Sequence, residues 1–360
     1  MSNWSRVVNT SIKDYIRGEE VNVLRNRKVL AMLMSKGRIS FNHSGTSTNW
    51  RVRFRRGTMQ GFGLGDTLTF PQIDRWKQAD LPWRGYAAAE AMYEMERLQN
   101  KGVAAIVKVY DTLAKTMMED ISENFCEEIY VDGNATGNSK RFHGLESMLS
   151  SSGVTRPFVA NPNDTYAGLS CTLAAAGGTW SGDWPSGRGD PQYDYWSPIL
   201  VNYTDSNASA WEATTKTWKN TCLEALSYGI IKGQRSKSKK GSLDTVFLEG
   251  ELYRQFVDRL RETQRIVYQP NSSNSTLVKL GFTDVQNYDG VDITWEYGMP
   301  TATGYGMNFD EMEVMSMQPQ LFVPKGPDED IASASYRFAI KAYGNFRLSP
   351  RNFTKWYAYT

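Results

Sequence analysis

Residues 103–130 read VAAIVKVYDTLAKTMMEDISENFCEEIY, which is the strongest helical pattern in the chain. Apolar residues recur on one side of this segment every three or four positions, as expected for a helix with one buried face. They are Ile106, Val109, Leu113, Met117, Ile121 and Phe125. At about 1.5 Å per residue the segment predicts a rod of about 42 Å. Asp132 and Gly133 follow, and we expect this glycine to end the helix.

The same helix carries glutamates at a spacing of four residues, namely Glu119, Glu123 and Glu127. Like charges at this spacing repel each other, so a solvated face is the plainest interpretation. The alternative is an acidic stripe that pairs with a basic segment of another subunit. A di-iron bundle would need Glu-x-x-His pairs on other helices, and the sequence contains none.

Residues 49–80, which precede the helix, predict a long β-hairpin. Trp50, Val52 and Phe54 alternate with arginines, a pattern typical of a half-buried strand. The glycines of residues 61–65 predict a flexible tip rather than a dinucleotide-binding loop, because the third glycine of that fingerprint is missing. An isolated hairpin is marginal in water, so we expect it to lie on a neighbouring subunit. The expected contact residues are Arg51, Arg53, Arg55, Arg56, Phe62, Leu64 and Trp76.

The hairpin arginines suit the acidic stripe of another subunit, because a guanidinium group forms forked hydrogen bonds with a carboxylate.

Further toward the N-terminus, residues 11–36 predict an amphipathic helical arm. Its basic residues make it a candidate for contact with a polyanion, although binding to a scaffold or a neighbour fits equally well. These residues are Arg17, Arg25, Arg27, Lys28 and Lys36.

The C-terminal part predicts a mixture of helices and strands, and therefore an α+β protein. Residues 154–207 are rich in glycine, serine and aromatic residues, and we interpret them as an ordered surface insertion. Two helices near 208–231 and 250–264 flank a buried strand at 245–248. Short strands are expected at 291–297, 312–323 and 332–348.

The composition excludes several classes of protein. With 41 Lys+Arg, 39 Asp+Glu and a net charge of +2, the 360-residue chain does not bind nucleic acid through its whole surface. Its 3 cysteines form no CxxC pair, so neither a zinc ribbon nor a disulfide framework is encoded, and a reducing compartment is expected. Of the 2 histidines, His143 has no nucleophile signature nearby and is expected to be structural. We expect no catalytic, cofactor-binding or metal site, no secretory signal and no membrane span.

This order of parts resembles the major capsid proteins of tailed bacteriophages, which have the Hong Kong phage type of capsid fold shared with herpesviruses and encapsulins. Three stretches add to the resemblance: Gly144–Gly153 after the long helix, Val291–Pro300 before a turn, and Ser335–Ile340 as a late strand. The resemblance implies an N-terminal arm, an extended hairpin loop, a peripheral domain with a spine helix, an axial domain with an insertion near 154–207, and a C-terminal strand that returns to the peripheral domain and ends in a tail. The corresponding boundaries are 1–48, 49–92, 93–153, 154–330 and 331–360.

The resemblance implies a structural protein of the virion that assembles, in the host cytoplasm, into pentamers and hexamers around double-stranded DNA. Implied partners are a separate scaffolding protein, a portal, a decoration protein and the packaged DNA, which is contacted without sequence specificity. An encapsulin-like shell around an enzyme cargo is the alternative, and an enzyme with an unrecognised site is a third hypothesis.

Some relatives join subunits through an isopeptide bond between a hairpin lysine and an asparagine, with help from a glutamate. This sequence has no lysine between Lys36 and Lys77, so the expected hairpin tip has no nucleophile. Lys77 is the remaining candidate, and Asn345 and Asn352 are the candidate acceptors. We therefore expect shells without covalent cross-links.

Overall fold

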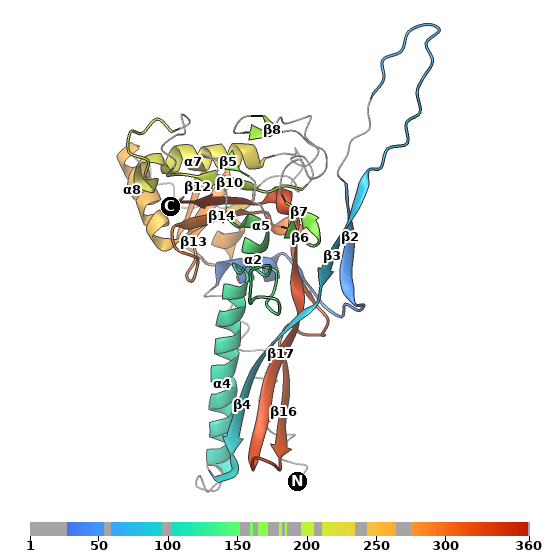
Figure 1. The fold of residues 1–360 in the computed structure, drawn as a ribbon. Coiled ribbons are helices and arrows are strands. Elements are labelled where there is room, and N and C mark those ends of the chain that lie inside the picture. The colour runs from blue at the N-terminus through green and yellow to red at the C-terminus, as the bar shows by residue number, and fades with distance from the viewer. Residues whose placement is uncertain are drawn as a thin grey trace.

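The long helix α4 spans Val103–Glu128 and lies along one end of an elongated molecule (Figure 1). The protein is seen here in a computed structural model that describes residues 27–53, 59–95, 103–151, 159–160, 165–171, 180–181, 184–185, 196–204, 211–234, 243–263 and 275–358. At about 1.5 Å per residue, α4 is about 39 Å long. Its apolar side is buried at Met117, Ile121 and Phe125, which confirms this part of the predicted stripe. The side chains of Ile106, Val109 and Leu113 lie outside the described residues.

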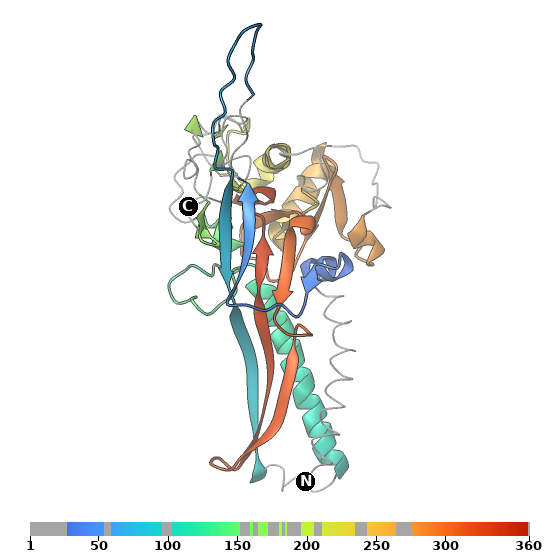
Figure 2. The same cartoon turned by 90° about the vertical axis from the view of Figure 1, so that its right-hand side faces the viewer.

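A five-stranded sheet lies beside α4 and forms the elongated half of the molecule. Its longest strand, β17 (Ser335–Leu348), pairs with β4 (Arg84–Tyr93) on one side and with β16 (Val323–Asp330) and β15 (Met312–Ser316) on the other. The short strand β1 (Ile39–Ser40) completes it through β15. Figure 2 shows β4, β17 and α4 running side by side. The predicted strand at 312–323 is therefore two elements, because β15 ends at Ser316 and β16 begins at Val323.

A seven-stranded sheet forms the other half. Its strands lie in the order β12 (Val285–Tyr288), β13 (Val291–Trp295), β11 (Thr245–Leu248), β14 (Thr303–Met307), β18 (Thr354–Tyr357), β10 (Ile199–Asn202) and β5 (Val159–Ala160). Helices α7 (Trp218–Gly233) and α8 (Gly250–Thr263) pack together against this sheet. The predicted buried strand at 245–248 is confirmed, and all of its residues are buried.

The remaining elements are short. They are α2 (Lys28–Ser35), β2 (Ser47–Arg53), β3 (Trp76–Pro82), α5 (Glu146–Leu149), β6 (Thr165–Tyr166), β7 (Leu169–Ser170), β8 (Trp180–Ser181), β9 (Trp184–Pro185), α9 (Thr276–Lys279), η3 (Phe309–Glu311) and η4 (Pro350–Asn352).

Two strands of the seven-stranded sheet fall in segments that we expected to be a surface insertion and a tail. Residues 199–202 are completely buried, as are residues 354–357, and the two segments pair with each other in parallel. Residues 199–202 of the expected surface insertion and residues 354–357 near the expected tail are therefore interior strands of this sheet. A four-residue buried strand has no alternation of polar and apolar residues, so periodicity does not reveal it.

Gly133 does not end α4 in the way we expected. The helix ends at Glu128, before the residues expected to cap it. The backbone of Gly133 does not have the positive φ angle of a left-handed cap residue. A Cβ atom on Gly133 would lie 2.8 Å from His143 Nδ1 and from the Phe142 carbonyl oxygen. This position therefore needs glycine because neighbouring groups approach the backbone closely, and not because of a left-handed helix cap.

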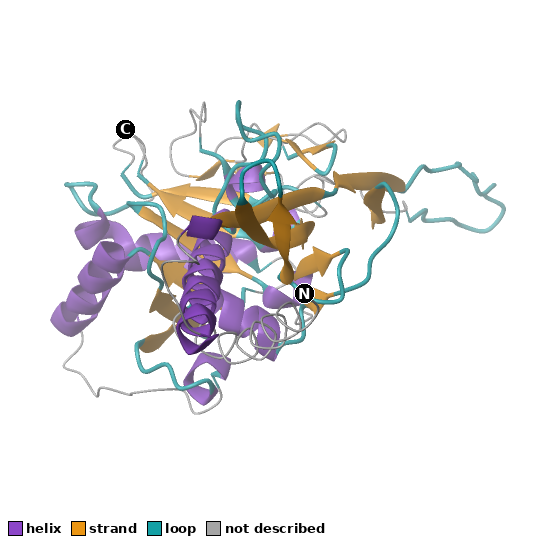
Figure 3. Ribbon diagram, turned by 90° about the horizontal axis from the view of Figure 1, so that it is seen from below, coloured by secondary structure: helices purple, strands orange, loops and turns teal. Residues whose placement is uncertain are grey.

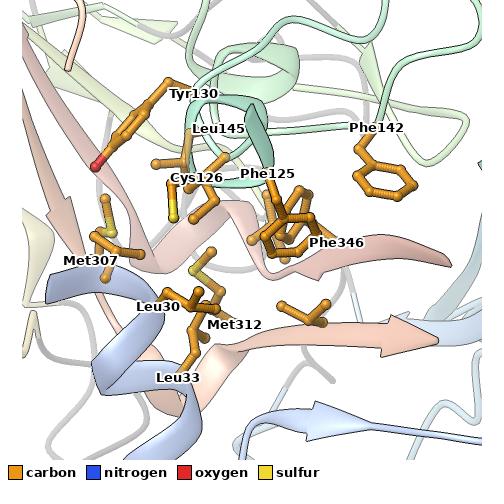
Figure 4. Packing of buried hydrophobic residues seen from close by; sticks show 14 of the residues in the cluster. Leu30, Leu33, Phe125, Cys126, Tyr130, Phe142, Leu145, Met307, Met312 and Phe346 are labelled. Atoms are coloured by element: carbon orange, nitrogen blue, oxygen red, sulfur yellow. The ribbon is translucent and has the colours of Figure 1, made fainter. Parts of the chain in front are cut away.

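The end of the N-terminal arm is part of the hydrophobic core. Val29 and Leu33 of α2 are 0% exposed, and Leu30 is 2% exposed. Figure 4 shows Leu30 and Leu33 packed with Met312 of β15 and with Cys126 at the C-terminal end of α4. The helix predicted over residues 11–36 is therefore present as α2 at 28–35, where it is buried in the core, while residues 1–26 lie outside the described part of the chain.

Substituting Gly229 tests how tightly α7 packs on the seven-stranded sheet. A Cβ atom there would lie 2.4 Å from the Trp356 ring, which is fully buried and donates a 2.8 Å hydrogen bond from Nε1 to the Ala225 carbonyl. We expect Gly229→Ala to lower the unfolding free energy by about 1–3 kcal/mol through overpacking, despite the higher helix propensity of alanine. Denaturant unfolding of the unassembled subunit measures this change.

The matched control is Gly250→Ala at the start of α8, where no atom lies within 4 Å of the added Cβ. Its stability should equal or slightly exceed that of the wild type. Equal stabilities for the two variants would contradict the packing described here.

Candidate subunit-contact surfaces

The predicted hairpin is present and projects beyond the body of the molecule (Figures 1 and 3). Strands β2 and β3 pair antiparallel from Ser47 opposite Pro82 to Arg53 opposite Trp76. Trp50 is half-buried, with the guanidinium of Arg347 5.3 Å from its ring centre. Arg51 and Arg53 are exposed, whereas Arg55 and Arg56 lie outside the described residues. The alternation in the sequence therefore corresponds to half-buried apolar residues that alternate with exposed arginines.

The tip of the hairpin exposes apolar side chains to solvent. Phe62 is 70% exposed and Phe70 is 90% exposed, while Leu64 is completely exposed and Trp76 is 55% exposed. Other exposed apolar residues here are Met59 and Leu68. Apolar side chains gathered on one projecting loop are typical of a protein–protein contact.

Local hydrogen bonds hold the tip in shape although it contains no strand. Gln60 donates from Nε2 to the Thr69 carbonyl at 2.8 Å and accepts from the Thr69 N–H at 3.0 Å. Asp66 accepts a 2.7 Å hydrogen bond from the Gly63 N–H. The loop is therefore partly ordered before it meets a partner, which reduces the entropy that binding costs.

A cleft of about 500 Å³ lies at the base of the hairpin. We call it the arginine cleft because it is lined by Arg38, Arg51, Arg53, Arg347 and Arg351, together with Trp50, Val52, Trp196, Asp310, Glu311, Glu313, Leu348 and Ser349. Ion pairs neutralise two of its carboxylates, at 3.0 Å between Arg38 and Asp310 and at 3.1 Å between Arg347 and Glu313. The cleft thus carries more positive than negative charge.

The acidic stripe on α4 faces solvent, since Glu119, Glu123 and Glu127 are all exposed. The guanidinium of Arg27 in the same chain lies 3.8 Å from Glu123, whose side chain is 70% exposed. An ion pair at this distance and exposure contributes little to stability. The structure therefore does not bring the stripe and the hairpin arginines of one subunit together, and pairing between subunits stays a prediction.

The basic residues at the end of the arm are turned into the subunit, which corrects our expectation of a polyanion contact at these positions. Lys28 is 8% exposed and donates 2.8 Å hydrogen bonds to Thr294 Oγ1 and the Trp295 carbonyl. Arg27 is 5% exposed and donates to the Tyr297 carbonyl. Lys36 pairs with Asp244 at 2.7 Å. Arg17 and Arg25 lie outside the described residues.

Glu296 fastens the start of α2 to β13, and the sequence analysis did not single it out. One carboxylate oxygen accepts a 3.0 Å hydrogen bond from the Val29 N–H, and the other has no hydrogen-bond partner among the described residues. Burial raises the pKa of Glu296 to about 7, which the Val29 N–H and the charges of Arg27 and Lys28 oppose. A single glutamate in an otherwise ordinary strand gives no sequence signal of such burial.

The described residues contain no sign of a catalytic or metal centre. No group of three or more His, Cys, Asp or Glu side chains among them is placed to hold a metal ion. His143 is buried and its backbone N–H donates to Asn345, while burial and the charge of Arg84 lower its pKa to about 4. None of the described helices is long and apolar enough to cross a membrane.

Comparison with known structures identifies the fold. The capsid asymmetric unit of cyanophage A-1(L) is 14% identical in sequence, with a TM-score of 0.55 over 89% of this chain and 90% of the other. The capsid of a native gene transfer agent (GTA) particle is 12% identical, with a TM-score of 0.52 over 90% and 89% of the two chains. The capsid of the myovirus XM1 is 13% identical, with a TM-score of 0.50 over 91% and 92%.

No protein-family model and no curated protein matches the sequence. At 12–14% identity the structural likeness establishes the fold. The chain therefore has the capsid fold of the Hong Kong phage type, and the predicted α+β class is confirmed.

Removing the charge of Glu296 tests the attachment of the arm. Because its pKa rises from 4.5 to about 7 on folding, the folded protein keeps a proton that the unfolded chain releases, and stability falls as the pH rises through this window. We expect Glu296→Gln to lose less stability than the wild type between about pH 5 and pH 8, as measured by thermal unfolding at both values.

His143 titrates in the opposite sense, because its folded-state pKa lies below the ordinary value. Wild type and Glu296→Gln both contain His143, so its contribution to the pH dependence of stability is the same in both. The difference between their pH dependences therefore reports on Glu296 alone. The control is Glu90→Gln, at an exposed carboxylate. A Glu296→Gln curve parallel to the wild-type curve would contradict the prediction.

Proposed function

We propose that this chain is the major capsid protein of a tailed bacteriophage. In this proposal its copies form the pentamers and hexamers of an icosahedral shell around double-stranded DNA, and its role is structural rather than catalytic. The observation that carries the proposal is the capsid fold shared with three phage or GTA capsids over about 90% of both chains. These structures are phage or GTA capsids, which favours a phage head over an encapsulin-like compartment.

The projecting hairpin supports assembly through repeated contacts between copies. The apolar side chains of its tip are not buried by the described part of their own subunit. A protein–protein interface of standard size, which buries roughly 1,600 Å² in total, would be enough to bury them. The hairpin and the surface that receives it are different patches, so the contact is heterologous. Such contacts close into rings when the rotation between subunits permits. Rings of five and six subunits satisfy this condition.

The same proposal assigns parts and partners. We propose that residues 1–48 are the arm, 49–92 the extended loop, 93–153 the peripheral domain, 154–330 the axial domain and 331–360 the C-terminal return. A scaffolding protein, a portal and a decoration protein are the proposed partners in the virion, and assembly takes place in the host cytoplasm. Contacts with packaged DNA would be few, salt-sensitive and without sequence preference. Electron microscopy of the expressed protein tests the proposal: closed shells support it, and a permanently monomeric protein contradicts it.

Deleting residues 57–66 tests the role of the hairpin. The deletion removes Phe62 and Leu64 but leaves the paired strands β2 and β3 intact. We expect a folded, soluble subunit that does not close shells, because the exposed contact is lost while the core is unchanged. Circular dichroism checks the fold and electron microscopy checks assembly. Normal particles from the deletion variant would show that the hairpin tip is not needed for shell closure.

The proposed shells are held together without covalent cross-links. Asn345 is 2% exposed and its amide donates a 2.8 Å hydrogen bond to the Pro82 carbonyl, and Asn352 is 1% exposed. Neither side chain is accessible to a lysine of another subunit. Particles boiled in detergent should therefore give one band near 40.7 kDa on a denaturing gel. A ladder of multimers that Lys77→Ala abolishes would overturn this prediction.

A further inference from the structure

The arginine cleft contains donors that its own subunit leaves unused. Arg38 Nε and Trp196 Nε1 are buried and have no hydrogen-bond partner among the described residues, and both side chains line the cleft. A buried donor without an acceptor destabilises the subunit, because it has lost its hydrogen bond to water. Arg51 is exposed and forms no ion pair with the described residues. The cleft is thus suited to a ligand that brings carboxylate oxygens.

The turn between β16 and β17 carries such oxygens. Asp328, Glu329 and Asp330 are the last residues of β16, and Ile331, which is 91% exposed, begins the turn that leads into β17. Asp330 is held within the turn by Arg337 and by a 2.7 Å hydrogen bond from Ser333. Asp328 and Glu329 are exposed and form no ion pair with the described residues. We call residues 328–331 the acidic turn, and it carries a net negative charge.

One subunit cannot bring its own acidic turn into its own cleft. The turn adjoins Ser335 at one end of β17, whereas Leu348 at the other end lines the cleft. A strand of 14 residues at about 3.3 Å per residue separates the two by roughly 45 Å. Figures 1 and 2 show the turn at the same end of the molecule as the N-terminal end of α4, far from the hairpin. Only another molecule can therefore occupy the cleft with this segment.

We propose that the arginine cleft of one subunit binds the acidic turn of a second copy of this chain. This inference rests on the proposed function, and it names a contact that would repeat between shell subunits. Glu329 would face the cleft arginines, because guanidinium groups bind carboxylates in forked hydrogen bonds, while Asp328 points to the other face of the strand. Cleft and turn are different surfaces, so the contact is heterologous and propagates from one copy to the next.

The acidic turn fits the cleft better than the acidic stripe on α4 does. A projecting turn can enter a cleft, whereas glutamates four residues apart lie flush along one side of a helix. Glu123 of the stripe also has Arg27 of its own chain nearby. Charge and shape therefore both favour the turn.

Charge reversal tests the contact. We expect Glu329→Arg and Arg51→Glu each to reduce the yield of shells by about tenfold, and the double variant to restore most of it, because reversing both charges recreates the pair. Sedimentation and electron microscopy measure assembly, and thermal unfolding of the subunits checks that each variant folds. The matched control is Glu119→Arg on the acidic stripe, which should assemble normally and should not rescue Arg51→Glu.

Each other outcome is decisive. Normal shells from both single variants would overturn the proposal, even if Arg51→Glu weakens binding to DNA. Rescue of Arg51→Glu by Glu119→Arg would overturn it in favour of the stripe. If the wild type forms no shells, the proposed function fails. Self-association that either single reversal weakens would still support the contact, whereas a strictly monomeric wild type would exclude it.

Discussion

The pairing of β17 with its neighbours is the interaction on which the rest of the structure depends. This strand pairs with β4 from Ser335 opposite Tyr93 to Gly344 opposite Arg84, and on its other edge with β16 and β15. The chain then passes through η4 directly into β18, in the middle of the other sheet. One continuous segment therefore ties the elongated half to the seven-stranded half. The distance between the acidic turn and the arginine cleft follows from the length of this strand.

Local sequence patterns were enough to predict the elements that bury one side over many residues. Helix α4 and the β2–β3 hairpin have apolar periods of the right length, and residues 245–248 form an apolar run bounded by turns. The fold class followed from the order of these parts. Strands β10 and β18 were missed because they pair with each other across more than 150 residues of sequence, and no local pattern specifies such a pairing.

The candidate site was less predictable than the fold. The hairpin residues were expected to be exposed, and Arg51, Phe62, Leu64 and Trp76 are. Arg27 and Lys28 have the same charge as any basic arm residue, yet the backbone carbonyls of residues 295 and 297 hold them inside the subunit. A buried cation depends on acceptors that only the tertiary structure supplies, so composition and spacing cannot distinguish it from a solvated one. The same holds for Glu296.

The burial of α2 limits how far the chain can be shortened from its N-terminus. A cut after Leu30 would detach side chains that pack on β15 and α4. A cut between Lys28 and Val29 would likewise separate the core from the hydrogen bonds that Arg27 and Lys28 donate to residues 294–297. A subunit shortened from its N-terminus therefore has to keep residues 27–35 if these contacts are to survive.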